Sequence, residues 1–352
     1  MGLQCWRRCN CVLWIVCLLI GLSGWYQVAI DIRYDDGPQG NPYFDPEQRF
    51  RFKFLLQPSS CHMEPGDGKT VIFVISRPFN YDDRVTVRET WGSVLRENGH
   101  SVLFIVGQQE SYTEYDLRIE AGFYDDLLMV ELIERYDNLI LKVYAAMQWA
   151  RRHCRNANWF GKVDVDAFMN PYNLMDRLKN KTKQWPRPIF GLCSAGDPPI
   201  RKSHTRYTVP LALYPLSKYP MYCKGSAYFI PYNELESMLN FIPIRGFPMT
   251  MEDLYYTGIL PEALGIPRHN EGSQYQEITE EDCYCVLSRT VILLQNVNVS
   301  TLSDALTHCW QRLQSCQRSR CLSDWLVDCS KLPLKNLSTE SYAKHFEIKP
   351  VG

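Results

Sequence analysis

The chain lacks a surplus of charge of either sign, since its 352 residues include 38 basic and 39 acidic side chains. Without a basic excess there is no electrostatic footprint for nucleic acid, which excludes that class of partner. The 14 cysteines include no two Cys-x-x-Cys pairs and the seven histidines are scattered, which argues against a thiolate zinc centre. Internal repeats and low-complexity tracts are also missing, so solenoid and fibrous architectures are excluded.

One long apolar run is present near the start, at residues 11–30. A helix of about 20 such residues is long enough to cross a bilayer. Arg7 and Arg8 precede the run and Asp31 follows it, so residues 1–10 are expected to be a cytoplasmic tail, with the rest of the chain in the lumen. A cleaved signal peptide is the alternative. The length of the run and the lack of an A-x-A-like site favour an uncleaved signal-anchor.

Features of the remaining chain agree with a luminal address. An even number of cysteines beyond an anchor is typical of disulfide-bonded proteins, and ten follow it here. They are Cys61, Cys154, Cys193, Cys223, Cys283, Cys285, Cys309, Cys316, Cys321 and Cys329. Asn180, Asn298 and Asn336 each begin an Asn-x-Ser/Thr triplet, the acceptor signal for N-glycosylation.

Apolar runs alternate with helical stretches in the middle of the chain. Strands are expected at 71–75, 101–106, 127–133 and 159–163, and helices at 84–98 and 138–152. This alternation predicts an α/β fold with a central, mostly parallel sheet and helices on both faces.

Composition divides the luminal part into three segments. Residues 31–68 are rich in Pro, Gly, Asp and Gln, which indicates a stem. Residues 69–294 are expected to form one catalytic domain. Residues 295–352 begin with a helical pattern and hold four cysteines, which indicates a Cys-rich C-terminal appendage.

Asp164 and Asp166 end the fourth strand and are separated only by Val165. Side chains alternate faces along a strand, so both carboxylates point the same way. A hard divalent cation that also holds a diphosphate needs such oxygens, and this is the chemistry of nucleotide-sugar transfer. The alternative is an Asp-x-Asp tripeptide that caps or solvates a turn.

Five short blocks occur in a fixed order: RVTVRETW at 84–91, YDNLILK at 136–142, KVDVDAFMN at 162–170, YPMYCKG at 219–225 and EDLY with a later glycine at 252–258. Together they resemble the β-1,3-galactosyltransferase and β-1,3-N-acetylglucosaminyltransferase family, glycosyltransferase family 31. The resemblance implies a GT-A-like nucleotide-sugar-binding fold, a UDP-sugar donor and Mn²⁺ or another divalent cation. It also implies a type II Golgi membrane enzyme that forms a β-1,3 bond, with inversion, to a glycan on glycoprotein or glycolipid.

On the donor side, the resemblance places Arg84, Arg88, Lys142 and Asp164 near the nucleotide, and gives Asp164 and Asp166 to the metal. Taken alone, Arg84 and Arg88 are four residues apart and share one helix face, where they could bind phosphate or lie on a solvated surface. Taken alone, Lys142 could be a surface lysine or a partner of the aspartate carboxylates.

On the acceptor side, the resemblance implies a binding role for Tyr222, Gly225 and Glu252, and makes Asp253 the general base. An inverting transfer needs one base to take the proton of the acceptor hydroxyl. Taken alone, Tyr222 and Gly225 fit a packed turn, and Glu252 with Asp253 fits an N-terminal helix cap.

Two departures from the family pattern bear on function. Val165 replaces the middle Asp of the family's triplet, and Gln295 stands near the place where many relatives carry a metal-binding His. His269 is a candidate substitute ligand. These departures support one other function, a catalytically silent relative that acts as partner or chaperone of active transferases. A carbohydrate-binding module without turnover is a second alternative, for which a base at Asp253 would have no purpose. Galactose is favoured over N-acetylglucosamine as the donor sugar, while oligomeric state and disulfide pairing stay open.

Overall fold

The computed structural model describes residues 52–109, 114–201, 207–241, 249–278, 290–294 and 302–319. The tail, the expected anchor at 11–30, most of the stem, Gln295, Asn298 and Asn336 lie outside these residues. Within the described part, no helix is long and apolar enough to span a bilayer.

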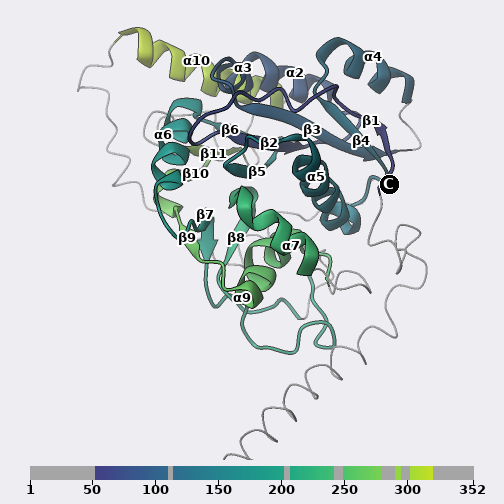
Figure 1. The fold of residues 1–352 in the computed structure, drawn as a ribbon, viewed down its shortest axis with the longest axis vertical. Coiled ribbons are helices and arrows are strands. Elements are labelled where there is room, and N and C mark those ends of the chain that lie inside the picture. Colours follow the sequence, from purple (N-terminus) through teal and green to yellow (C-terminus); the bar gives the residue numbers. More distant parts are fainter. Residues whose placement is uncertain are drawn as a thin grey trace, which may run out of the picture.

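An eight-stranded sheet forms the centre of the protein, with the strand order β1-β4-β3-β2-β5-β8-β7-β9 (Figure 1). Its strands are β1 (Phe54–Leu56), β2 (Thr70–Ile75), β3 (Ser101–Gln108), β4 (Leu127–Ile133), β5 (Trp159–Asp164), β7 (Ile189–Ser194), β8 (Tyr222–Pro231) and β9 (Arg268–Asn270). The four strands expected from the apolar runs are confirmed, and they form the parallel centre. The sheet as a whole is mixed, because β1, β8 and β7 join it through antiparallel pairs.

Helices cover both faces of this sheet, as the alternating pattern predicts (Figure 1). One face carries α5 (Leu139–His153), α7 (Leu235–Phe241), α8 (Glu252–Leu254), a π-helical turn η3 (Tyr255–Ile259) and α9 (Leu260–Leu264). The other carries α2 (Tyr81–Glu89), α3 (Trp91–Glu97), α4 (Glu114–Tyr124), α6 (Pro171–Thr182) and α10 (Leu302–Ser319). Short 3-10 turns lie at η1 (Tyr136–Asn138), η2 (Tyr232–Glu234) and η4 (Gly272–Gln274).

The alternation of side chains in the central strands produces two separate cores. Val71 and Phe73 of β2 pack on the α5 side, whereas Ile72 and Val74 pack on the α2 side. All four are fully buried, as expected for strands that read as continuous apolar runs.

The helix expected at 84–98 is divided in the structure. Thr90 has φ −111° and ψ −118°, outside the helical region, so α2 ends before it and α3 begins after it. Polar and apolar periodicity continues across the break, which is why the sequence pattern did not reveal it.

A second, three-stranded sheet lies beside the first and was not predicted. It has the order β10-β11-β6, with β6 (Ala167–Met169), β10 (Tyr275–Ile278) and β11 (Val291–Leu294). β6 follows Asp166 directly and pairs antiparallel with β11. Within the expected appendage the structure describes α10, whose buried Leu306 and Leu313 belong to the same core cluster as α2 and α3.

Candidate active site

Asp164 is the last residue of β5, opposite Ile75 of β2, and Asp166 lies on the turn to β6. This is the carboxyl end of parallel strands, where α/β sheets bind ligands. Asp166 is exposed, and its pKa is raised by loss of hydration next to the surrounding protein atoms and by the negative charge of Asp164. The two carboxylates are therefore close enough to repel each other, and together they offer hard oxygen donors of the kind that divalent cations bind.

No third ligand joins this pair among the residues that the structure describes, where no group of three or more His, Cys, Asp or Glu side chains has a metal-binding arrangement. His269, the substitute candidate, lies on β9 and is more than half exposed. Its Nε2 is 3.3 Å from a carboxylate oxygen of Glu271.

Lys162 connects the aspartate pair to the far end of the site. The side chain is 1% exposed, and its Nζ donates to Asp164 Oδ1 at 2.6 Å and to the carbonyl oxygen of Gly225. The same Nζ lies 3.0 Å from Glu252 Oε1. Burial lowers the pKa of Lys162, but the two carboxylates outweigh burial and hold that pKa above its usual value. The residue is thus a buried cation shared by carboxylates from two distant parts of the chain.

Glu252 and Asp253 begin the short helix α8, which packs against β8. Glu252 is 3% exposed, and its other oxygen accepts a hydrogen bond from the Tyr228 hydroxyl at 2.8 Å. Loss of hydration raises the pKa of Glu252 to about 7, despite the nearby Lys162. Burial and the Lys162 cation thus shift the pKa of this acid in opposite directions.

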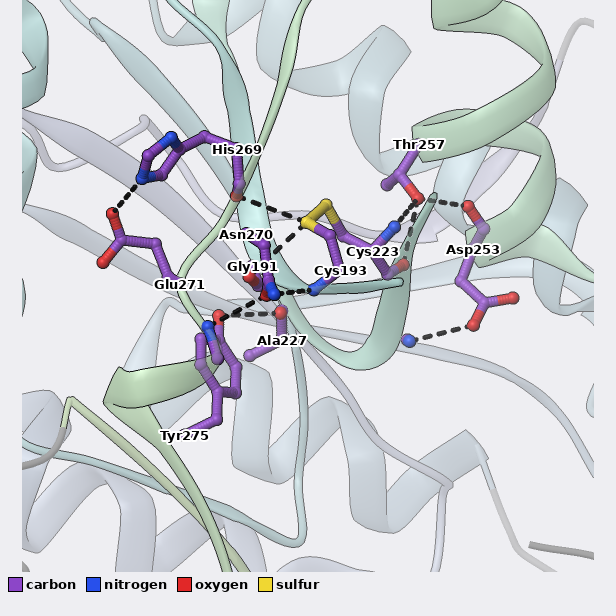
Figure 2. Close-up of a disulfide and its surroundings, with 12 residues drawn as sticks. Gly191, Cys193, Cys223, Ala227, Asp253, Thr257, His269, Asn270, Glu271 and Tyr275 are labelled. Carbon is purple, nitrogen blue, oxygen red and sulfur yellow. Dashed lines mark hydrogen bonds and ion pairs between the residues drawn. A yellow bond between two sulfur atoms is a disulfide. The ribbon is translucent and has the colours of Figure 1, made fainter. Parts of the chain in front are cut away.

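The Asp253 carboxylate is held by backbone groups. Its Oδ2 accepts from the Gly225 N–H at 2.9 Å, and its Oδ1 accepts from the Leu254 N–H at 2.8 Å. Loss of hydration is the largest influence on this group and raises its pKa, while the two N–H donors oppose that rise. Figure 2 shows the side chain beside the Cys193–Cys223 disulfide of the β7–β8 hairpin.

Tyr222 is 4% exposed and belongs to a polar cluster on this hairpin. Its hydroxyl accepts from Lys224 Nζ at 3.1 Å and donates to Asp197 Oδ2 at 3.4 Å. Lys224 also donates to Asp197 at 3.1 Å. The structure therefore brings Tyr222, Gly225, Glu252 and Asp253 together through β8, and adds Lys224 and Asp197 to them.

Lys142 lies in the interior, at the loop that follows β2. Its Nζ donates to the carbonyl oxygen of Ser76 at 2.9 Å and to both oxygens of Glu134 at 2.7 and 2.8 Å. Burial lowers its pKa, and Glu134 partly offsets that effect. The surface-lysine alternative is wrong, because only 4% of the side chain is exposed.

Arg84 and Arg88 share one helix face, as their spacing predicts, but that face is buried rather than solvated. Both guanidinium groups donate to Glu120 of α4, and Arg88 also binds Asp126. Arg84 donates further to the Ser76 hydroxyl and to the Arg77 and Pro78 carbonyls. The structure thus places Arg84 beneath the loop after β2, where it supports that loop from within the protein.

A profile described as galactosyltransferase matches residues 82–272, more than half of the chain. The chain belongs to the galactosyltransferase family. The resemblance drawn from the five blocks is thereby confirmed, and the matched range contains every residue predicted for the donor, metal and acceptor sides.

Several curated members of the galactosyltransferase family are similar to this chain. β-1,3-Galactosyltransferase 1 of Homo sapiens and of Mus musculus is 28% identical over 288 residues, which cover 80% of this chain and 85% of the relative. Human β-1,3-galactosyltransferase 9 is 31% identical over 201 residues, or 56% and 54% of the two chains. The lactosylceramide 1,3-N-acetyl-β-D-glucosaminyltransferase of Xenopus tropicalis is 29% identical over 203 residues, or 55% and 52%.

Solved structures of other glycosyltransferases align only loosely with this member of the family. A glycosyltransferase involved in glycosylation of the major capsid of PBCV-1 covers 68% of this chain and 98% of its own, with 14% identity and a TM-score of 0.34. A mannosyltransferase from Pyrobaculum calidifontis in complex with GDP-Man and Mn²⁺ covers 72% and 66%, with 13% identity and a TM-score of 0.34.

Sequence reasoning missed Lys162, although it belongs to the same block as the aspartate pair. Lys162, Asp164 and Asp166 are spaced two apart, and the period of a strand puts such residues on one face. That spacing was a usable signal for a cation beside the carboxylates. Asp197 and Lys224 gave no comparable signal, because the hairpin that joins them depends on an antiparallel pair that was not predicted.

Proposed function

We propose that the protein is an inverting β-1,3-glycosyltransferase that transfers galactose, in preference to N-acetylglucosamine, from its UDP ester to a hydroxyl of a glycan acceptor. The observation that carries this proposal is Lys162, which contacts both Asp164 and Glu252 and so joins the aspartate pair and the Glu252-Asp253 pair in one cluster. Family membership supports a sugar-transfer reaction. The names of the β-1,3-galactosyltransferase relatives support the donor sugar and the linkage.

In the proposed reaction the acceptor hydroxyl attacks the anomeric carbon on the face opposite the diphosphate. The new bond joins the acceptor oxygen to this carbon, the bond from carbon to diphosphate oxygen breaks, and UDP leaves with the electron pair. Asp253 takes the hydroxyl proton as general base. The Gly225 and Leu254 N–H groups hold its carboxylate in place for this step.

The aspartate pair fits a divalent cation, for which we propose Mn²⁺. Asp164 and Asp166 lie at the strand end, and the pKa of Asp166 is raised by loss of hydration and then by the negative charge of Asp164. When bound there, the cation would neutralise charge on the donor diphosphate. The protein's own contribution is to present the two carboxylates at the end of β5 and on the turn that follows it, with Lys162 fixing the orientation of Asp164.

Donor binding on this side involves the loop after β2. Lys142 and Arg84 both donate to its backbone carbonyls, at Ser76 and at Arg77 and Pro78. We assign them, and Arg88 through the shared Glu120, to supporting the loop against the nucleotide. The acceptor is proposed to lie over Tyr222, Gly225 and Glu252, on the β8 side of Asp253.

The test uses the full chain in detergent with a UDP-sugar panel, Mn²⁺ and a glycan panel, and measures release of UDP. The wild type should release UDP, Asp166→Ala should abolish the release, and Asp253→Asn should lower kcat by about 10²–10⁴-fold. Asp176→Asn, an exposed carboxylate on α6, is the matched control and should keep wild-type turnover. Equal inactivity of folded wild type and variants would overturn the proposal in favour of a silent relative.

We place the enzyme in the Golgi membrane as a single-pass type II protein, with the apolar run at 11–30 as its anchor. Asn180, exposed at the end of α6, provides the test of this orientation. Expressed in mammalian cells, the full chain should lose apparent mass on glycosidase treatment, and Asn180→Gln should remove part of that shift. A chain that carries no glycan at all would contradict luminal placement.

A further inference from the structure

Thr257 is a fully buried residue of the π-helical turn η3, four positions after Asp253. Its hydroxyl accepts a hydrogen bond from the Cys223 N–H at 2.8 Å. The oxygen also lies 2.9 Å from the Cys223 carbonyl and 2.5 Å from the Asp253 carbonyl, so its single proton is shared between these two acceptors. One side chain therefore joins β8 to the turn that carries the proposed base (Figure 2).

The need for this hydroxyl follows from where the neighbouring strand ends. β8 pairs with β5 only from Pro231 to Ala227, because β5 finishes at Asp164. Cys223 lies beyond that ladder, while on its other side it faces Cys193 of β7. A buried N–H and C=O without a strand partner are costly, and the Thr257 hydroxyl satisfies both.

A second hydrogen bond joins β8 to this turn two residues after Cys223, and here the acceptor is Asp253, the proposed base. The Gly225 N–H donates to Asp253 Oδ2 at 2.9 Å. Asp253 is thus tied to β8 at both its carbonyl, through Thr257, and its carboxylate, through Gly225. A threonine hydroxyl bonded to the carbonyl four residues back bends a helix, and π-helical turns recur at functional sites.

We propose that Thr257 is a positioning residue that fixes the direction of the Asp253 carboxylate toward the acceptor hydroxyl. The inference rests on the proposed function of Asp253 and deepens it. Thr257 is 0% exposed, so it touches no substrate and acts only through Asp253 and β8. Without its hydroxyl, the turn at 253–257 loses both hydrogen bonds to Cys223 and keeps only the bond between Gly225 and the Asp253 carboxylate as its hydrogen bond to the strand at 223–225. The carboxylate then loses its fixed direction.

The experiment compares three variants of the full chain. Thr257→Val removes the hydroxyl at nearly constant volume, and Thr257→Ser retains it. Thr70→Val is the matched control, because Thr70 is also 0% exposed and donates its hydroxyl to a backbone carbonyl, that of Trp159, at the opposite end of β2 and β5. Each is measured for kcat and for KM of the UDP-sugar, and amide exchange is followed over the peptide that contains Gly225.

Thr257→Val should lower kcat at least tenfold with KM for the donor changed less than twofold, and should speed exchange at Gly225 at least tenfold. Thr257→Ser and Thr70→Val should stay within threefold of wild type in both measurements. Wild-type kcat or unchanged exchange at Gly225 in Thr257→Val overturns the proposal. The exchange readout holds even if Asp253→Asn proves fully active, an outcome that would instead defeat the assignment of the base.

Discussion

His100 is a buried imidazole at the amino end of β3, 5% exposed, whose Nδ1 accepts a hydrogen bond from the Thr70 N–H at 3.2 Å. Burial, followed by the positive charge of Lys69, lowers its pKa from 6.5 to about 4. As the pH falls below 6.5, His100 therefore becomes protonated in the unfolded chain while it stays neutral in the folded protein.

The contribution of His100 to the free energy of unfolding should thus be fully present above pH 6.5 and be lost as the pH falls toward 4. This loss amounts to at most about 3 kcal/mol. Urea denaturation at pH 7.5 and pH 5.0 measures the loss. His100→Asn keeps a hydrogen-bond acceptor that does not titrate, so it should reduce the difference between the two pH values. An equal difference in variant and wild type would show that other groups cause it.

At the scale of single residues, patterns in the sequence indicate candidate groups but not the packing around them. The position of Asp164 at the end of a strand could be predicted from the apolar run before it, whereas the turn that carries Asp166 departs from the period of that strand. The burial of Arg84 could not be predicted, because it depends on Glu120, which lies 36 positions away on another helix. Partnerships of this kind are set by packing, so local patterns do not contain them.

Helix α4 is held to α2 by Glu120, whose carboxylate binds Arg84 at 2.6 Å and Arg88 at 2.7 Å with almost no exposure on any of the three. Glu120→Gln would leave two buried cations with one carboxylate fewer, and removing one partner of a buried ion pair costs about 3–5 kcal/mol. We expect a loss of that size in urea denaturation. Glu114→Gln, in the exposed Glu114–Arg118 pair of the same helix, is the control and should cost less than about 0.5 kcal/mol.

Among the elements, the central strands were predictable and the peripheral ones were not. β2, β3, β4 and β5 lie between two layers of helices, so each reads as an unbroken apolar run. β6 and β9 are only three residues long, and their pairing comes from partners far along the chain. The break at Thr90 and the π-helical turn after Leu254 are local departures that periodicity does not encode.

At the scale of the molecule, two disulfides join distant segments in different places. Cys61–Cys154 links the segment before β2 to the end of α5, and Cys193–Cys223 crosses the hairpin beside Asp253. Cys309 of α10 is also disulfide-bonded, so the disulfides that the cysteine count predicts are present.

Removing either disulfide should lower the free energy of unfolding by about 2–5 kcal/mol, but only the removal of Cys193–Cys223 should also lower kcat. Cys61→Ala with Cys154→Ala should lower the thermal midpoint and leave kcat of the folded enzyme unchanged. Cys193→Ala with Cys223→Ala should lower both, because the Cys223 backbone holds Thr257. Thermal denaturation and UDP release at a temperature where both variants are folded distinguish the two effects. Equal kcat in both double variants would contradict the prediction.

The pairing of β6 with β11 sets an order of events during synthesis. The turn that bears Asp166 leads into β6, yet the strand that β6 pairs with, Val291–Leu294, leaves the ribosome much later. A nascent chain interrupted before residue 291 has made every acidic residue proposed for the reaction and still lacks the strand that pairs with β6, the segment directly after Asp166. Shortened translation products or splice forms ending there should accordingly be inert, however intact their motifs.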